Sequence, residues 1–468
     1  MNKFTQWMEQ HFLPVAAKIG SQRHLVAIRD AFIGIMPITM VGSVAVLLNV
    51  FFRDLPTEWG ATSFVETMAP IIGINGNVWF GSIAIIALVF VFSLGYNIAK
   101  SYDVNPLAGG IIAFSSFIVT LPQTANFLYA LPGVSIDNLD ALTELGVQAQ
   151  IVGENLNIDV SGWGYIGLSY AGASGLFTAL IIGFISSMIY VKLMLKGITI
   201  KLPDSVPSAV NKAFAAIIPG IIAVYVAATL GYLSVTYLGF SINDLILEYI
   251  QKPLLGLSQG LFSVILTTFL IQVFWFFGLH GPNVLAPIMD GVYLPALVTN
   301  TEAYEAAQSA ADLPYIWTRV SFDAYSQMGG SGITLALIIA IFIFSKRKDS
   351  KTIAKLGAPM GLFNINEPIV FGMPIVLNPF YIIPWLIIPP ITATIAYLLT
   401  AAGIIPPTFV AVPWVMPVGV LAYLATGGSW LAGLASIFNL FISFVIWSPF
   451  VILANRVNKV DKEDKQIA

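Results

Sequence analysis

Long apolar stretches recur along the whole chain, separated by shorter polar segments. Each is close to the roughly 20 residues that an α-helix needs to cross the hydrocarbon core of a bilayer. The stretches occupy 31–52, 79–99, 105–126, 162–191, 213–238 and 257–279, with further ones within 331–345 and 380–455, where Pro and Gly blur the boundaries. This pattern predicts an all-α polytopic membrane protein without a separate soluble domain.

The composition supports a membrane environment. The chain of 468 residues is 57% hydrophobic and 10% charged, whereas ordinary globular chains carry roughly 25% charged residues. It contains no Cys, which excludes disulfides, thiol nucleophiles and Cys-based metal sites within this sequence. Because no basic patch is interleaved with aromatic residues, we expect no nucleic-acid partner.

Basic residues mark one side of the membrane. Five clusters hold 18 of the 21 Lys and Arg residues and, counted with their nearest neighbours in the chain, only 8 of the 24 acids. They run from Lys3 to Arg29, at Lys100, from Lys192 to Lys212, from Lys346 to Lys355 and from Arg456 to Lys465. The loops expected between spans hold 15 acids and three basic residues; they are 52–78, 127–161, 239–256 and 290–325. By the positive-inside rule, both termini are cytoplasmic and the number of crossings is even.

Three segments outside the spans have their own character. Near the start of the chain, apolar side chains recur at helical spacing at Phe4, Trp7, Met8 and Phe12. Residues 1–25 are therefore expected to form a cytoplasmic amphipathic segment on the membrane surface, and not a signal peptide. The acidic segment 127–161 has the composition of a loop and is expected to cap the outer side. The basic segment 346–355 is either a solvated turn or a contact with a cytoplasmic partner or anionic lipid.

Glu367 is the only charged residue between Leu356 and Asn455. A carboxylate at hydrocarbon depth is costly unless it faces protein, water or a ligand. It lies between Asn364, Asn366 and Pro368, and the neighbouring Gly and Pro residues predict an interrupted helix, which membranes tolerate where it lines a cavity. We interpret Glu367 as part of a site for a polar ligand; the alternative is a carboxylate that stabilises a nearby helix N-terminus.

His280 is the second polar feature, because it is the only ionisable residue between Lys252 and Asp290. Gly281 and Pro282 follow it and interrupt the helix, as Pro368 does after Glu367. Two interrupted helices that each present polar residues resemble the discontinuous elements of transporter sites. The alternative is a histidine at a helix end, bonded to backbone carbonyl groups.

These residues suit a neutral, hydroxyl-rich ligand. Sugars bind to carboxylates, amides, imidazoles and aromatic faces, and the chain offers Glu367, Asn364, Asn366, His280, Asn283, Trp275 and Trp414. Both tryptophans have an equally good interpretation as interface or core residues. One His and one Glu are too few ligands for a metal ion, so we expect neither a metal nor a cofactor.

Four segments carry a family resemblance, in the order Lys201–Pro207 (KLPDSVP), Trp275–His280 (WFFGLH), Gly329–Thr334 (GGSGIT) and Asn364–Pro368 (NINEP) with the trailing FGMP. Together they resemble the membrane component, enzyme IIC, of the phosphoenolpyruvate-dependent sugar phosphotransferase system. The similarity is to its lactose, cellobiose and diacetylchitobiose branch and covers essentially the whole chain, from Ile28 to the basic tail.

The resemblance implies a fold and a location. Such proteins are homodimers in the bacterial cell membrane, with about ten spans and two re-entrant hairpins. In this chain, 26–250 would be the dimerisation domain, 251–455 the sugar-transport domain and 456–468 a cytoplasmic tail. Membrane lipid and a second copy of the chain are thus expected partners.

The resemblance also implies an activity. A β-linked disaccharide of the cellobiose or diacetylchitobiose type is taken up from outside and phosphorylated at a primary hydroxyl by a phosphocysteine on a IIB component. Since this chain has no Cys, IIB must be a separate protein, and the phosphoryl-carrying residue is absent here. The family's sugar-contacting Glu and His correspond to Glu367 and His280. Whether Glu367 is also a catalytic base stays open.

Two rival functions remain at this stage. A proton-coupled secondary sugar transporter would use Glu367 as the proton carrier, without phosphotransfer. A sugar sensor would bind the ligand without transporting it. The four motifs favour the phosphotransferase interpretation, but they do not select one disaccharide.

Overall fold

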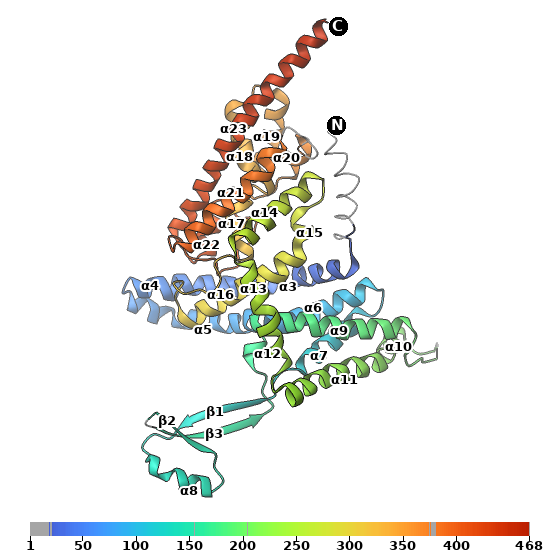
Figure 1. The fold of residues 1–468 in the computed structure, drawn as a ribbon, viewed down its shortest axis with the longest axis vertical. Coiled ribbons are helices and arrows are strands. Elements are labelled where there is room, and N and C mark those ends of the chain that lie inside the picture. Colours follow the sequence, from blue (N-terminus) through green and yellow to red (C-terminus); the bar gives the residue numbers. More distant parts are fainter. Residues whose placement is uncertain are drawn as a thin grey trace.

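The computed structural model describes residues 21–153, 155–203, 205–373 and 381–467, together with Lys18 and Ile375. This part of the chain is mostly helical, with one small β-sheet (Figure 1). Seven helical segments are long and apolar enough to cross a membrane: Arg23–Thr57, Thr62–Ser101, Ala173–Leu195, Ser208–Leu238, Arg319–Phe344, Ile382–Ala401 and Trp430–Asn455. A further pair, Ile242–Ser258 and Leu261–Phe276, is bent by 74°. The predicted polytopic helical fold is confirmed, while the amphipathic segment around Trp7 lies outside the described residues.

The first group of helices packs around α6, which contacts α3, α7 and α9. Its members are α3 (Arg23–Asn49), α4 (Leu55–Glu58), α5 (Thr62–Phe80), α6 (Ile86–Ser101), α7 (Pro106–Ile118), α9 (Leu176–Leu195), α10 (Ser208–Ala215) and α11 (Ile217–Leu233). Small residues bring α6 and α7 together, since a Cβ atom on Gly95 would lie 2.5 Å from the carbonyl oxygen of Gly109. Such close backbone contact is typical of helix pairs in membranes.

The second group carries the interrupted helices. It comprises α14 (Leu261–Phe276), α17 (Arg319–Ser326), α18 (Thr334–Phe344), α19 (Lys348–Gly361), α20 (Glu367–Gly372), α21 (Ile382–Ala401), α22 (Val420–Ala425) and α23 (Trp430–Ile467). Two fully buried tryptophans link helices of this group to one another through hydrogen bonds. The Trp385 indole donates to the Gln272 carbonyl at 2.9 Å, and the Trp447 indole donates to the Gly332 carbonyl at 3.1 Å. The second bond holds the loop that precedes α18.

Four shorter helices connect the two groups: α12 (Ile242–Ile246), α13 (Lys252–Ser258), α15 (Gly281–Ile288) and α16 (Leu294–Ala307). Helix α16 makes polar contacts with the first group. Its Tyr304 hydroxyl donates to Asp54, in the π-helical turn after α3, at 2.7 Å. Its Glu302 carboxylate accepts from the backbone N–H of Ala173 at 2.8 Å. The two groups therefore meet along α16 and α3.

The segment 127–161, expected to be a loop, contains a three-stranded antiparallel sheet. Its strands are β1 (Thr124–Ala130), β2 (Ala149–Val152) and β3 (Asn155–Trp163), in the order β1-β3-β2, with helix α8 (Leu139–Glu144) between β1 and β2. The sheet projects from the helical body at the end opposite the C-terminus (Figure 1). The strands are rich in aromatic and β-branched residues, which favour a pleated ribbon. The all-α expectation was wrong for this segment.

Two expected boundaries also differ for a common reason. The span expected over 105–126 ends as a helix at Ile118, because its last residues enter β1. The span expected over 162–191 is one long helical segment only from Ala173, since its first residues belong to the end of β3. Apolarity alone does not separate a strand from a helix. The other expected loops are largely helical and contain α5, α12, α13, α16 and α17.

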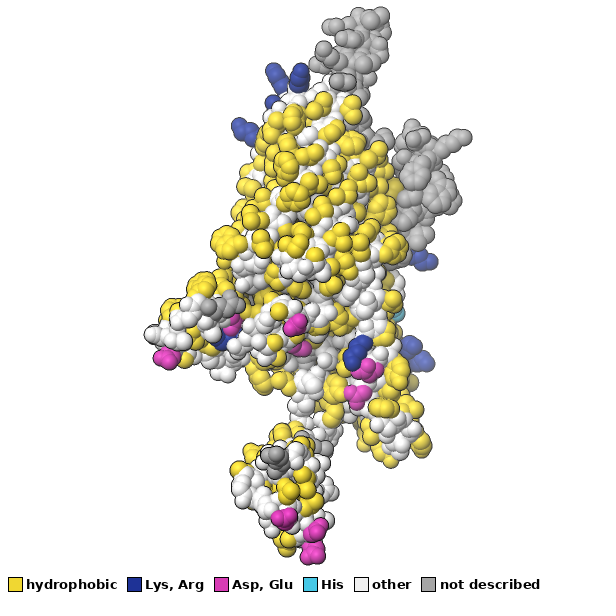
Figure 2. Space-filling view, turned by 60° about the vertical axis from the view of Figure 1, so that its left-hand side comes forward, with side chains coloured by type: hydrophobic (Ala, Val, Ile, Leu, Met, Phe, Trp, Pro, Cys, Tyr) yellow, Lys and Arg dark blue, Asp and Glu magenta, His cyan; other side chains and the backbone are white. Residues whose placement is uncertain are grey.

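Charged side chains separate on the surface (Figure 2). Lys and Arg lie mainly near the upper end and at the right of this view, whereas Asp and Glu lie on the projecting sheet and across the lower part of the helical body, where some neighbour Lys or Arg. Hydrophobic side chains cover the flank between them. This distribution agrees with the charge asymmetry on which the predicted orientation rests.

That orientation can be tested with single cysteines, because the chain has none of its own. We expect Ser135→Cys, in the exposed sheet region, to react with a membrane-impermeant thiol reagent added to intact cells. Thr352→Cys, exposed on α19, should react only after the cytoplasmic face is opened. The reverse pattern would invert the orientation.

Candidate functional site

A cavity of about 570 Å³ lies between α3, the interruption that precedes α15 and the one that precedes α20. Its size is within the range of small-molecule sites. All seven residues predicted from the sequence line it: Trp275, His280, Asn283, Asn364, Asn366, Glu367 and Trp414. The two interrupted segments are 87 positions apart at His280 and Glu367 in the chain, yet they meet at this one space.

His280 caps the N-terminus of α15. Its Nδ1 accepts a hydrogen bond from the backbone N–H of Asn283 at 3.2 Å, so the neutral ring carries its proton on Nε2 and can donate it to a ligand. Gly281 is required next to it, because a Cβ atom there would lie 2.1 Å from the carbonyl oxygen of Ile271. The alternative of a histidine at a helix end is therefore partly right. Its partner, however, is a backbone N–H group and not a carbonyl, and Nε2 stays available to a ligand.

Glu367 is the first residue of α20 and its side chain is exposed to the cavity. Among the described residues it has no hydrogen-bond or ion-pair partner. Its place in the first helical turn is favourable for a negative charge, so both interpretations from the sequence fit this position. The neighbouring Asn366 is buried, and its amide donates to the carbonyl of Ser331 at 2.9 Å.

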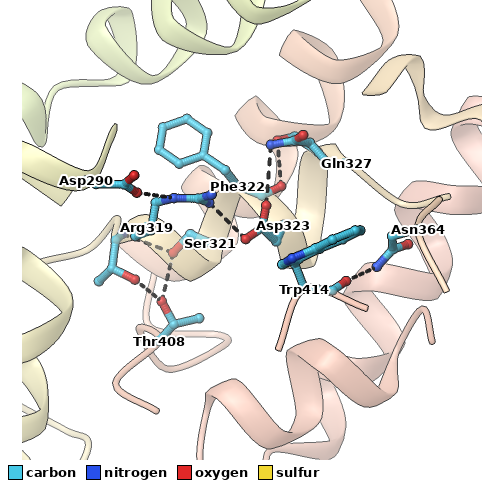
Figure 3. Close-up of polar contacts among 11 residues, drawn as sticks. Asp290, Arg319, Ser321, Phe322, Asp323, Gln327, Asn364, Thr408 and Trp414 are labelled. Atoms are coloured by element: carbon cyan, nitrogen blue, oxygen red, sulfur yellow. Dashed lines mark hydrogen bonds and ion pairs between the residues drawn. The ribbon is translucent and has the colours of Figure 1, made fainter. Parts of the chain in front are cut away.

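Asn364 holds the interruption together. It has a left-handed backbone with φ of 63°, which Asn adopts more readily than most residues. Its Oδ1 accepts from the N–H of Gly329 at 2.7 Å, and its Nδ2 donates to the carbonyl of Met416 at 2.9 Å. The same Nδ2 donates to the carbonyl of Trp414 at 2.5 Å (Figure 3). Since both amide N–H groups are used, Asn364 positions the cavity wall and has little capacity left for a ligand.

The two candidate aromatic platforms differ in accessibility. Trp414 is 45% exposed and lies on the cavity wall. Trp275 is 4% exposed, and its ring packs against that of His280 with centroids 4.8 Å apart. Trp414 can therefore present a ring face to a ligand, whereas Trp275 mainly supports His280.

A charged network on the cavity wall was missed by the sequence analysis. The Arg319 guanidinium lies between two carboxylates, with Nε 2.9 Å from Asp290 and Nη1 2.8 Å from Asp323 (Figure 3). Gln327 donates to Asp323 at 3.4 Å, and all four residues line the cavity. A signal existed, because Arg319 is the only Lys or Arg between Lys252 and Lys346.

The helix that carries this network is anchored at its start. Thr318 and Ser321 form a reciprocal capping box at the N-terminus of α17. Both hydroxyls also bond to the hydroxyl of Thr408, at 2.6 and 2.8 Å. Thr408 begins the buried stretch that leads to Trp414, so α17 and the aromatic wall of the cavity are fixed to each other.

A family model described as "Phosphotransferase system, EIIC" matches residues 29–389. The chain belongs to this EIIC family. The cellobiose-specific EIIC component of Lactococcus lactis subsp. lactis (strain IL1403) is 42% identical to this EIIC chain, over 98% of the chain and 100% of the relative. The oligo-beta-mannoside-specific EIIC component of Bacillus subtilis (strain 168) is 34% identical, over 98% of the chain and 96% of the relative.

A solved structure supports the same assignment. The transporter ChbC, the IIC component of the N,N'-diacetylchitobiose-specific phosphotransferase system, aligns with a TM-score of 0.85 and 30% sequence identity. The alignment covers 98% of this EIIC chain and 99% of that structure. The chain is thus a multi-pass membrane protein and works with a sugar and a IIB component, as the resemblance implied.

The role of Asn364 can be tested by stability. We expect Asn364→Ala to lower the free energy of unfolding by about 2–3 kcal/mol, because three hydrogen bonds to buried or partly buried backbone groups are lost. Thermal unfolding in detergent, followed by tryptophan fluorescence, measures it. Asn283→Ala is the matched control, since that side chain is exposed. Equal melting temperatures for the two variants would contradict this role.

Proposed function

We propose that this EIIC chain takes up a β-linked disaccharide of the cellobiose or diacetylchitobiose type and presents it to a phosphorylated IIB protein. The proposal rests mainly on one observation. The carboxylate of Glu367 and the imidazole of His280, which come from two different interrupted helices, line the same cavity, and its volume suits a disaccharide. The substrates named for the relatives are β-linked oligosaccharides, which supports the same ligand class.

The side chains divide the recognition between them. His280 Nε2 donates to a sugar oxygen, and the Glu367 carboxylate, which has no partner in the described part of the chain, accepts from one or two hydroxyls. The exposed face of Trp414 packs on the C–H side of a sugar ring. Asn283 and Asn366 line the same space and offer further amide groups, while Trp275 and Asn364 hold their neighbours in place.

The chemical step needs a second protein. The phosphoryl group moves from a cysteine sulfur of IIB to a primary hydroxyl oxygen of the sugar, so a P–S bond breaks, a P–O bond forms and the hydroxyl proton must leave. Glu367 lines the cavity and would accept that proton, acting as a general base as well as a ligand-binding residue. This chain has no Cys and cannot carry the phosphoryl group by this route.

The finer architecture belongs to the same proposal. About ten spans, cytoplasmic termini and two re-entrant hairpins whose tips hold His280 and Glu367 would bring the sugar to a protein partner inside the cell. Residues 26–250 would pair with a second copy in the bilayer, and 251–455 would carry the sugar. The packing of the helices into two groups joined along α16 and α3 supports this division.

The two polar tips can be tested by affinity. We expect Glu367→Gln to weaken disaccharide binding by about 1.5–3 kcal/mol, which is roughly 10- to 150-fold. His280→Ala should weaken it by a comparable or smaller factor. Isothermal titration on the purified protein gives both values. If both groups hold one ligand cooperatively, the double variant should lose less than the sum.

Unchanged affinity in a well-folded Glu367→Gln variant would leave this carboxylate only its role at the helix N-terminus. Leu362→Gln is a useful control, because it adds an amide at an exposed position that does not line the cavity.

Partner dependence is a separate test. In reconstituted vesicles we expect the chain alone to exchange labelled disaccharide but to form no sugar phosphate. Sugar phosphate should appear only when phosphoenolpyruvate, the general phosphotransferase proteins and IIB are all present. Sugar phosphate without IIB would refute the partner requirement. Uphill uptake driven by a proton gradient alone would favour the rival secondary transporter.

A further inference from the structure

The cavity wall has an excess of negative charge. Among the described residues that line it, Asp290, Asp323 and Glu367 carry carboxylates, and Arg319 is the only Lys or Arg. Arg319 is already shared between the two aspartates, at 2.9 and 2.8 Å. With neutral His280, the formal charge of the wall is therefore −2. A negative wall is unfavourable for binding a phosphate ester, which is the product of the proposed reaction.

The excess charge distinguishes the two ligands of the transport cycle. A disaccharide is neutral, whereas a phosphate monoester carries about −1.5 to −2 charges at pH 7. At an effective dielectric constant of about 20, repulsion between unit charges exceeds thermal energy out to roughly 25 Å. A cavity of about 570 Å³ holds any bound phosphate well within that distance of all three carboxylates.

The position of Arg319 prevents it from attracting the phosphate ester and so offsetting the repulsion by the carboxylates. Its positive charge lies between two carboxylates, and the Asp323 side chain also accepts from Gln327. A phosphate that approached Arg319 would also come close to the two aspartates paired with it. Figure 3 shows this arrangement, with the guanidinium enclosed between Asp290 and Asp323. The network therefore behaves as a singly negative unit.

We propose that the Asp290–Arg319–Asp323 network is a specificity determinant that retains the neutral disaccharide and expels its phosphorylated product. Phosphorylation would convert a well-held ligand into one that the wall repels, so release would follow the chemical step and rebinding would be suppressed. The inference rests on the proposed function, because it assigns the same cavity to the sugar and to its phosphate.

Binding of cellobiose and of cellobiose 6′-phosphate to the purified full chain tests the inference. We expect the wild type to bind the phosphate at least about 30-fold more weakly than the sugar. Asp323→Asn keeps an acceptor for Arg319 and removes one negative charge. It should shrink the ratio of the two dissociation constants about tenfold, or ~1.4 kcal/mol, and Asp290→Asn should act in the same direction.

Two controls separate charge from structure. Asp349→Asn removes an exposed carboxylate on α19 that is paired with Arg347, and it should leave the ratio unchanged. Raising the salt concentration should shrink the wild-type ratio, because ions screen the repulsion. If the aspartates had only a structural role, their substitution would weaken the binding of the sugar and of the sugar phosphate equally, and the ratio of the two dissociation constants would not change.

The outcomes are distinguishable. A ratio that responds to neither aspartate variant nor to salt would mean that the phosphate is excluded by shape, and it would overturn the inference. Equal affinity of the wild type for sugar and sugar phosphate would also overturn it. If Asp323→Asn fails to fold, Asp290→Asn and the salt series still decide. If the wild type binds no β-linked disaccharide, the proposed function itself fails, and the inference falls with it.

Discussion

Every interruption of a helix within an apolar environment leaves backbone N–H and C=O groups that need partners, and the site of this protein depends on how that need is met. Side-chain amides meet it. Gln259 bonds to both the N–H and the carbonyl of Trp317, and Asn300 does the same for Tyr315. Asn364 satisfies three backbone groups from two different loops, one at Gly329 and two at Trp414 and Met416. A side-chain amide has both a donor and an acceptor and no charge, so it can bond to a backbone N–H and to a backbone carbonyl, as a neighbouring strand would. A carboxylate could accept from the N–H group, but it would place a negative charge next to the carbonyl oxygen.

This arrangement leaves the charged groups for the cavity. Because the amides satisfy the backbone, Glu367 needs no partner among the described residues and stays available to a ligand. Among the described residues of the wall, Arg319 is the one cation, and its two aspartate partners compensate its charge. A neutral ligand rich in hydroxyls suits such a wall, since it offers donors to the carboxylates and an acceptor to His280. Membership in the EIIC family and the geometry of the cavity thus point to the same kind of ligand.

Much of the fold follows from apolarity and length, because a bilayer demands long apolar helices whatever their packing. The small sheet did not follow. The first strand, β1, continues the apolar stretch of the neighbouring span, and only pairing with β3, from Thr124 opposite Trp163 along the ladder, makes it a strand. The register of such pairs depends on contacts between residues far apart in the chain, which local pattern does not contain.

For the site, the sequence by itself determined which residues are expensive to bury. Glu367 and His280 stand out as isolated ionisable groups in apolar segments, and the physical cost of placing them there identifies them without any structure. The tertiary structure alone decided what each polar residue does. It committed the amide of Asn364 to backbone groups and brought Arg319 from a polar stretch onto the cavity wall beside Asp323. The free-energy cost of burying a charged residue depends on that residue and on its neighbours in the chain, so the sequence shows it. Its hydrogen-bond partners depend on how distant segments pack in three dimensions, which the sequence pattern does not show.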